Sequence, residues 1–174
     1  MNQPFSMQTL SKEFTEQSVF RMEENVLRIV KCFSELTEEE IWKKPNTQSN
    51  SIGNLVLHLR GNITQYIISS MGGNEDHRKR DLEFSTKGGF TKQQLIDKLS
   101  KVVDQSIAII NKASDSELIR TRKVQAYQLS GVGIIIHVVE HFSYHTGQIT
   151  FWTKYLKNKD LGFYDGLDLN KKNE

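Results

Sequence analysis

The feature that most constrains the fold of this chain is a helical spacing of apolar residues that proline hardly interrupts. Only two prolines occur in 174 residues, Pro4 and Pro45, and no alternating apolar and polar run of useful length is bounded by turn residues. Proline breaks helix interiors, and strict alternation is the pattern of a half-buried strand. The sequence therefore predicts an all-α fold.

Apolar residues at helical spacing mark four long segments. We expect helices from about Met7 to Glu35, from after Asn50 to Gly72 and Gly73, from about Thr91 to Lys112, and from about Ser130 to Leu156. Four long helices joined by short and long links are typical of a four-helix bundle. At 174 residues the chain has the length of one domain, so we expect a single domain over residues 1–174 with loose last residues.

Smaller patterns fill in the connections. Thr37 with Glu40, Thr91 with Gln94, and Ser114 with Glu117 have the spacing of capping boxes, the last one before a short link to residue 130. In the first helix the residues that recur near helical spacing are Phe14, Val19, Phe20, Val26, Leu27, Val30 and Phe33. In the polar tail, Leu161, Phe163, Tyr164 and Leu167 could dock on the bundle.

The second and third long segments are joined by a long polar connection, GGNEDHRKRDLEFSTKGGF. It runs from Gly72 to Phe90 and exceeds the usual length of a helix-to-helix loop. Its length therefore indicates a functional or crossover segment and predicts a long loop between the second and third helices.

Charge and composition exclude several classes of protein. The net charge is +2, from 23 basic and 21 acidic residues spread along the chain, without the basic stripe of a nucleic-acid binder. No stretch approaches the roughly 18 apolar residues of a membrane span, and residues 1–9 lack the pattern of a signal peptide. The single cysteine, Cys32, fits a reducing compartment and a core position. We expect a cytoplasmic protein with no nucleic-acid or membrane partner.

A line of polar side chains runs along the otherwise apolar last helix. His137, His141 and His145 recur every four residues, and Gln148 continues the line. Imidazoles at i and i+4 are about 6 Å apart along the axis and can share one ion, whereas those at i and i+8 are about 12 Å apart and cannot. Spacing alone therefore allows either His137 with His141 or His141 with His145.

His58 is the third donor that either pair needs. It lies in a second polar line, Asn54, His58, Asn62 and Gln65, on an apolar helix. Two facing helices with matching polar lines indicate an inward-facing site. A hydrogen-bonded network of core histidines is the alternative that spacing leaves open. His77, in the polar connection, is expected to be solvated.

Two segments resemble a known family. SIGNLVLHLRGN around His58 and HVVEHFSYHTGQI around His141 and His145 are similar to the DinB-like, or YfiT-like, superfamily of metal-dependent enzymes. The resemblance implies a four-helix bundle in which these three histidines bind one divalent metal ion, with the Gly-Gln pair at Gly147 following. Many members of that superfamily have arginine after the last histidine, where this chain has Thr146.

Further residues are candidates for the surroundings of that metal. The resemblance selects the pair of His141 with His145, which leaves His137 outside the ligand set. We expect the second shell or substrate pocket to contain His137, Glu140, Asn54, Asn62 and Gln148. In the polar connection, RKRDLEF resembles a charged pattern, R-x-R-D-x-E-F, of one branch of the family. Its Arg78 and Arg80 could hold a substrate carboxylate, or could belong to a solvated charge run.

Three histidines leave at least one metal position open, which is typical of a catalytic site. We expect zinc or nickel first, with iron or manganese as further candidates. The resemblance implies a metal-dependent S-transferase that uses a low-molecular-weight thiol such as bacillithiol or mycothiol on a small-molecule substrate. A metal-dependent hydrolase and a non-catalytic metal- or ligand-binding stress protein are the alternatives. Bundles of this kind are often homodimers, which makes a homodimer an expectation here.

Overall fold

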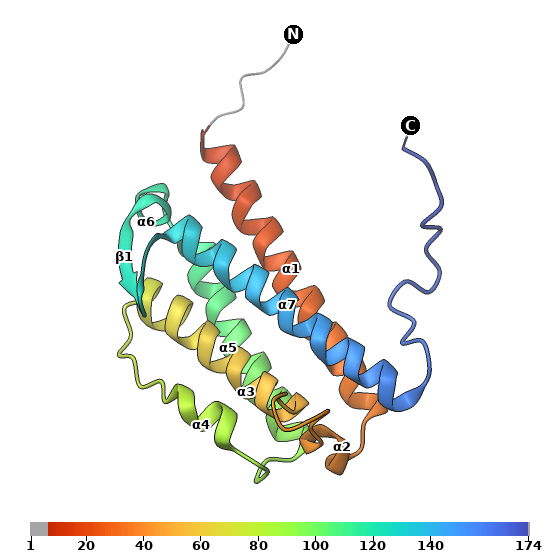
Figure 1. Cartoon of the computed structure of the whole chain (residues 1–174). Helices are drawn as coiled ribbons and strands as arrows, with labels where there is room; N and C mark the ends of the chain where they lie inside the picture. Colours follow the sequence, from red (N-terminus) through yellow and green to blue (C-terminus); the bar gives the residue numbers. More distant parts are fainter. Residues whose placement is uncertain (1–6, 174) are drawn as a thin grey trace.

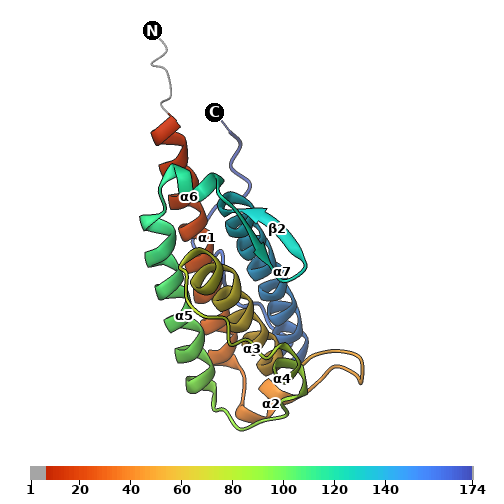
Figure 2. The ribbon, with the colours of Figure 1, turned by 90° about the vertical axis from the view of Figure 1, so that its left-hand side faces the viewer.

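Four long helical segments lie side by side in the computed structural model, which describes residues 7–173 (Figures 1 and 2). The elements are α1 (Met7–Glu35), α2 (Glu38–Trp42), α3 (Ile52–Ile63), the π-helical segment η1 (Thr64–Met71), α4 (Arg80–Ser85), α5 (Lys92–Lys112), α6 (Asp115–Ile119), β1 (Thr121–Val124), β2 (Tyr127–Ser130) and α7 (Gly131–Lys157). The long segments α1, α3–η1, α5 and α7 match the four predicted helices, so the prediction of a mostly helical fold is confirmed.

Capping residues start these helices where the sequence predicts. Thr37 and Thr91 form capping boxes with Glu40 and Gln94. Ser114 accepts from the backbone N–H of Glu117, but the carboxylate of Glu117 binds Arg120 and Arg122 instead of closing the box. Side-chain caps satisfy the backbone N–H groups that a helix start leaves unpaired, so they fix where each helix begins.

The second long segment changes geometry halfway. It starts at the N-cap Ser51 as α3 and continues from Thr64 as η1, whose last π-type bond runs from the N–H of Gly72 to the carbonyl of Ile67 at 2.8 Å. Gly73, at φ +73°, then takes the left-handed conformation that ends the segment. Both glycines were predicted as its end. The π geometry was not expected, and π turns are found frequently at functional sites.

The link between α6 and α7 is a β-hairpin, where the sequence predicted only a short connection. β1 and β2 pair antiparallel, with Val124 opposite Tyr127 and Gln125 at φ +52° in the turn. Two features hide it in the sequence. The inward position 122 is an arginine, which disguises the alternation, and the two-residue turn lacks the glycine or asparagine that usually marks one.

The buried face of α1 also differs from the apolar pattern. Of the residues that recur near helical spacing, Phe20, Leu27 and Val30 are exposed. Phe33, which belongs to the predicted pattern, is buried, and the core is completed by Met22, Ile29, Cys32 and, just after the helix, Leu36. The buried polar residues Thr15, Ser18 and Asn25 continue this face. The hydroxyls of Thr15 and Ser18 and the amide Nδ2 of Asn25 donate to carbonyls of their own helix, whereas Oδ1 of Asn25 is buried without a partner among the described residues.

Cys32 lies in the core, as predicted, and burial raises the pKa of its thiol. In the tail, Leu161 is buried and Phe163 packs on the core, whereas Tyr164 and Leu167 are exposed, so only half of the predicted docking occurs. Within residues 7–173 no helix has the length and apolarity to cross a membrane.

The connection between η1 and α5 folds back along α3 and contains the short helix α4, which was not predicted (Figures 1 and 2). The amide Nδ2 of Asn54 donates to the backbone carbonyls of Glu83 at 2.9 Å and of Thr86 at 2.7 Å. Asn54 is fully buried and also closes the capping box of α3. This one side chain therefore fixes α4 against the start of α3.

Candidate metal centre

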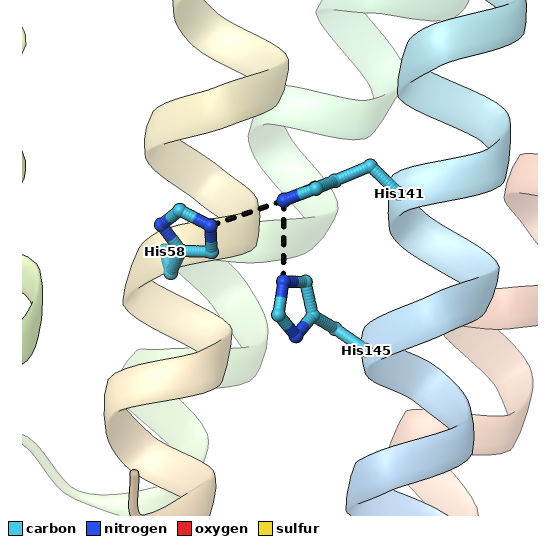
Figure 3. A group of neighbouring side chains, drawn as sticks. All are labelled: His58, His141 and His145. Atoms are coloured by element: carbon cyan, nitrogen blue, oxygen red, sulfur yellow. Dashed lines mark hydrogen bonds between the residues drawn. The ribbon is translucent and has the colours of Figure 1, made fainter.

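Three histidine side chains from two helices converge on one point (Figure 3). His58 comes from the middle of α3, and His141 and His145 come from successive turns of α7. The Nε2 atom of His141 lies 3.0 Å from that of His58 and 3.2 Å from that of His145. The three ligand nitrogens all lie within 4.8 Å of one another, and the group contains no carboxylate oxygen.

Two of these imidazoles have their tautomer fixed by an acceptor on the far side of the ring. Nδ1 of His58 lies 2.8 Å from the carboxylate of Glu83, and Nδ1 of His145 lies 2.7 Å from Oε1 of Gln148. An acceptor at Nδ1 requires the proton there and leaves a bare lone pair on Nε2. A neutral His141 can donate one proton from Nε2, so at least one N···N contact has no proton. A cation among the three lone pairs resolves this conflict, and the residues fit a divalent metal ion.

The surroundings favour the uncharged form of His141 and His145, the form in which a histidine binds a metal. Burial, followed by repulsion from His145 and His58, lowers the pKa of His141 to about 3. Burial also lowers the pKa of His145, although the hydrogen bond to Gln148 opposes it. Protons therefore compete weakly for these two nitrogens near neutral pH.

The depressed pKa of His141 predicts that the metal-free protein loses stability in acid. The unfolded chain protonates this residue near its ordinary pKa of about 6.5, while the folded chain keeps it neutral down to about 3. The unfolded state binds more protons in that window, so stability is full above about pH 6.5 and falls as the pH drops toward 3. Urea unfolding at pH 7 and pH 4.5 measures the loss. His141→Gln should lose less; an equal loss in both proteins would contradict the assignment.

Behind His58 lies a buried ion pair. The guanidinium of Arg78 donates to Glu83 through Nε at 2.8 Å and Nη2 at 2.9 Å, and to Oε1 of Gln65 through Nη1 at 2.9 Å. The side chains of Arg78 and Glu83 are 3% and 10% exposed. Burial alone would raise the pKa of Glu83, but the hydrogen bonds from Arg78 and His58 outweigh it and lower that pKa. Glu83 is therefore an ionised carboxylate that orients a candidate metal ligand.

Gly61 makes room for this carboxylate. A Cβ at position 61 would lie well inside contact distance of Oε1 of Glu83, 2.8 Å from its Cδ and 3.0 Å from Nε of Arg78. Arg78 and His58 hold the carboxylate in place, so it cannot move aside freely.

We expect Gly61→Ala to destabilise the protein and weaken metal binding, although alanine is the better helix former. Gly147 is the matched control, since it also lies inside a helix but a Cβ there meets nothing within 4 Å. Gly147→Ala should stabilise by about 0.5–1 kcal/mol. Thermal unfolding and metal titration of both variants test this. A stabilised Gly61→Ala protein would show that the close approach is unimportant.

His137 lies beside the cluster but outside it. Its Nε2 pairs with Nδ2 of Asn62 at 3.3 Å, and its ring stacks on Tyr66 at 4.2 Å and on His141 at 5.7 Å. Tyr66 in turn donates to Gln125 at the hairpin tip. The structure thus groups His141 with His145 and His58, which is one of the two pairs that spacing allowed, and leaves His137 next to them.

The remaining candidates are spread around the site. Gln148 touches His145, and Asn54 acts through α4 rather than through the histidines. Arg78 holds Glu83 of its own chain. Arg80 is exposed and lies over the ring of Phe84 at 4.9 Å, which itself lies 4.7 Å from the His58 ring.

Two more predicted residues lie at the surface. Glu140 is exposed on α7, and His77 is exposed and faces Glu75 at 3.4 Å, as expected for a solvated residue. The contact that the sequence did not reveal is Glu83 to His58. Glu83 belongs to the charged RKRDLEF pattern, whose position next to α3 depends on the fold of the connection.

The comparisons with known proteins agree with the fold. Three crystal structures resemble the chain: a DinB-like protein of Bacillus subtilis, YjoA (17% identity, TM-score 0.62, 83% of this chain and 94% of that one), a DinB-like protein of Bacillus cereus (15%, 0.65, 82% and 90%), and a conserved protein of Enterococcus faecalis (14%, 0.64, 89% and 99%). A search of curated proteins finds no match.

The likeness to the two DinB-like structures agrees with the resemblance of the motifs around His58 and His141. At these identities it establishes the fold. The family model of a protein of unknown function, DUF1572, matches residues 9–165, which is nearly the whole chain. The chain therefore belongs to the DUF1572 family and has a DinB-like fold.

Proposed function

We propose that the protein binds one divalent metal ion on Nε2 of His58, His141 and His145 and catalyses the transfer of a low-molecular-weight thiol to an electrophilic small molecule. The observation that carries the proposal is the convergence of three imidazole nitrogens, two of them held as bare lone pairs by Glu83 and Gln148. Three neutral imidazoles suit zinc or nickel, with iron and manganese as further candidates.

The protein side chains prepare the site in two ways. Burial keeps His141 and His145 neutral. Glu83 orients the ring of His58, and Gln148 orients the ring of His145. A divalent ion bound by three protein ligands keeps a position for a further ligand and lowers the pKa of a thiol or a water that binds there.

A thiol suits this site better than a water. Hydrolysis needs a base to take a proton from water, and the nearest buried carboxylate, Glu83, is already engaged by Arg78 and His58. Glu140 is exposed, and no carboxylate oxygen belongs to the group of ligand atoms found in residues 7–173. A free thiol has an ordinary pKa of about 8.5 and ionises far more readily than water, so it depends less on a base.

The proposed reaction is a substitution. A carbon–sulfur bond forms between the thiol and the electrophilic carbon, the leaving group departs with its bonding electrons, and the thiol proton passes to solvent. The reaction consumes one thiol and one electrophile and requires no oxidant or reductant.

The test compares metal-free protein with protein loaded with zinc, nickel, iron or manganese. Each sample receives bacillithiol and monochlorobimane, and the fluorescent conjugate is measured. The His141→Ala protein, treated in the same way, is the control. We expect conjugation above the spontaneous rate only for the wild-type protein with metal. Ester hydrolysis by the loaded protein without thiol would instead identify a hydrolase. Bound metal with neither activity would identify a binding protein, and both results would overturn the transferase proposal.

A further inference from the structure

A groove of about 520 Å³ is lined by both residues of the Arg78–Glu83 pair. It is formed by one face of α3 and by the connection that carries α4, the two elements that lie against each other in Figures 1 and 2. Leu57, Arg60 and Gly61 of α3 and Thr64 at the start of η1 line it, at the spacing of one helix face. None of the three clustered histidines lines it, so it is a separate site.

The groove carries an excess of positive charge. Three cationic side chains line it, Arg60, Arg78 and Lys79, against two carboxylates, Glu75 and Glu83. Glu83 is neutralised by Arg78, and Glu75 faces the exposed His77.

Arg60 and Lys79 are the cations that remain available. They are exposed, and neither side chain makes an ion pair or hydrogen bond with any residue in the described part of the chain. Two such cations at the rim of one groove can bind an anion together, with charge-assisted hydrogen bonds.

Three apolar side chains also line the groove. Leu57 is 8% exposed and Leu82 is 57% exposed, and Phe90 is half-buried. An exposed leucine at the edge of a groove has apolar surface that a ligand can cover. The combination of apolar walls with two free cations at the rim suits a ligand that has an apolar body and one anionic group.

We propose that this groove binds a small molecule with a carboxylate or phosphate on a short apolar body. Arg60 and Lys79 hold the anionic group, and Leu57, Leu82 and Phe90 cover the apolar body. The site is independent of the metal, because its lining contains neither His141 nor His145. It shares the Arg78–Glu83 pair with the metal centre, since Arg78 and Glu83 line the groove and Glu83 also contacts His58.

The test uses three probes on metal-free protein: octanoate, phenyl phosphate, and octanamide as the neutral match of octanoate. Binding is measured by isothermal titration calorimetry at low and high salt. We expect at least one of the two anions to bind, octanamide to bind more weakly than octanoate, and anion binding to weaken with salt. The preferred anion shows whether the natural ligand carries a carboxylate or a phosphate. If neither anion binds, the proposal is wrong.

The paired variant Arg60→Gln with Lys79→Gln should bind the preferred anion about tenfold more weakly or worse, since two charge-assisted contacts are lost. The matched control, Lys101→Gln with Lys112→Gln, removes two exposed charges from α5 that do not line the groove, and should bind as wild type does. Equal weakening in both pairs would show only a general effect of net charge and would overturn the site. Because all measurements use metal-free protein, a failure of the metal centre does not affect them.

Discussion

Replacing His141 with alanine is expected to abolish stoichiometric metal binding. Its Nε2 is the central atom of the cluster, 3.0 Å from Nε2 of His58 and 3.2 Å from that of His145. Loss of a residue that hydrogen-bonds to a metal ligand typically lowers metal affinity 10–100-fold, and loss of a ligand itself should lower it further. His58→Ala should have the same effect. Metal content after desalting, together with a zinc titration, measures both.

Two histidine variants serve as controls. His137→Ala removes a neighbour that pairs with Asn62, and His77→Ala removes an exposed side chain of the polar connection. Both proteins should keep one metal ion per chain. Circular dichroism shows whether each variant still folds. If folded His58→Ala and His141→Ala proteins retain full metal, the three histidines are not the site.

The sequence determined the long helices because their signals are local. The caps Thr91 and Ser130 and the terminal Gly73 each act within one turn of a helix, and the structure has them at the predicted places. The hairpin and the inner face of α1 could not be read in this way. There Arg122 and Asn25 are buried although they are polar. Arg122 donates to the backbone carbonyls of Glu117 and Arg120, and Asn25 donates to the carbonyl of Arg21 in its own helix. A pattern of apolar residues does not reveal polar side chains that are buried in this way.

The sequence identified the histidines of the site. It did not show which pair on α7 joins His58, nor which side chains orient these histidines. Four-residue spacing on α7 treats the pair of His137 with His141 and the pair of His141 with His145 alike. The rotation of α7 against α3 decides between them. It places His58 against His141 and Asn62 against His137. The motif resemblance chose the same pair, because the family pattern places its two histidines just before a Gly-Gln pair, as at His141, His145 and Gly147 here.

Glu83 is the residue whose replacement separates positioning from coordination. Glu83→Gln keeps the shape of the side chain but removes the charge that His58 and Arg78 face at 2.8–2.9 Å. The carboxylate raises the basicity of its imidazole partner, so metal affinity should fall about 10–100-fold. The variant also leaves the guanidinium of Arg78 buried without its partner, which costs about 3–5 kcal/mol in comparable pairs. Zinc titration and urea unfolding of metal-free protein measure the two effects.

The two effects can be separated by a second change. In Glu83→Gln combined with Arg78→Gln the buried unpaired charge is gone, so most of the stability should return, while the loss of metal affinity should persist because His58 still lacks a carboxylate. Glu75→Gln, at an exposed position of the same segment, should stay within about 0.5 kcal/mol of wild type and bind metal normally. Full metal affinity in Glu83→Gln would mean that the carboxylate only pairs with Arg78. Recovery of affinity together with stability would mean that the loss came from unfolding alone.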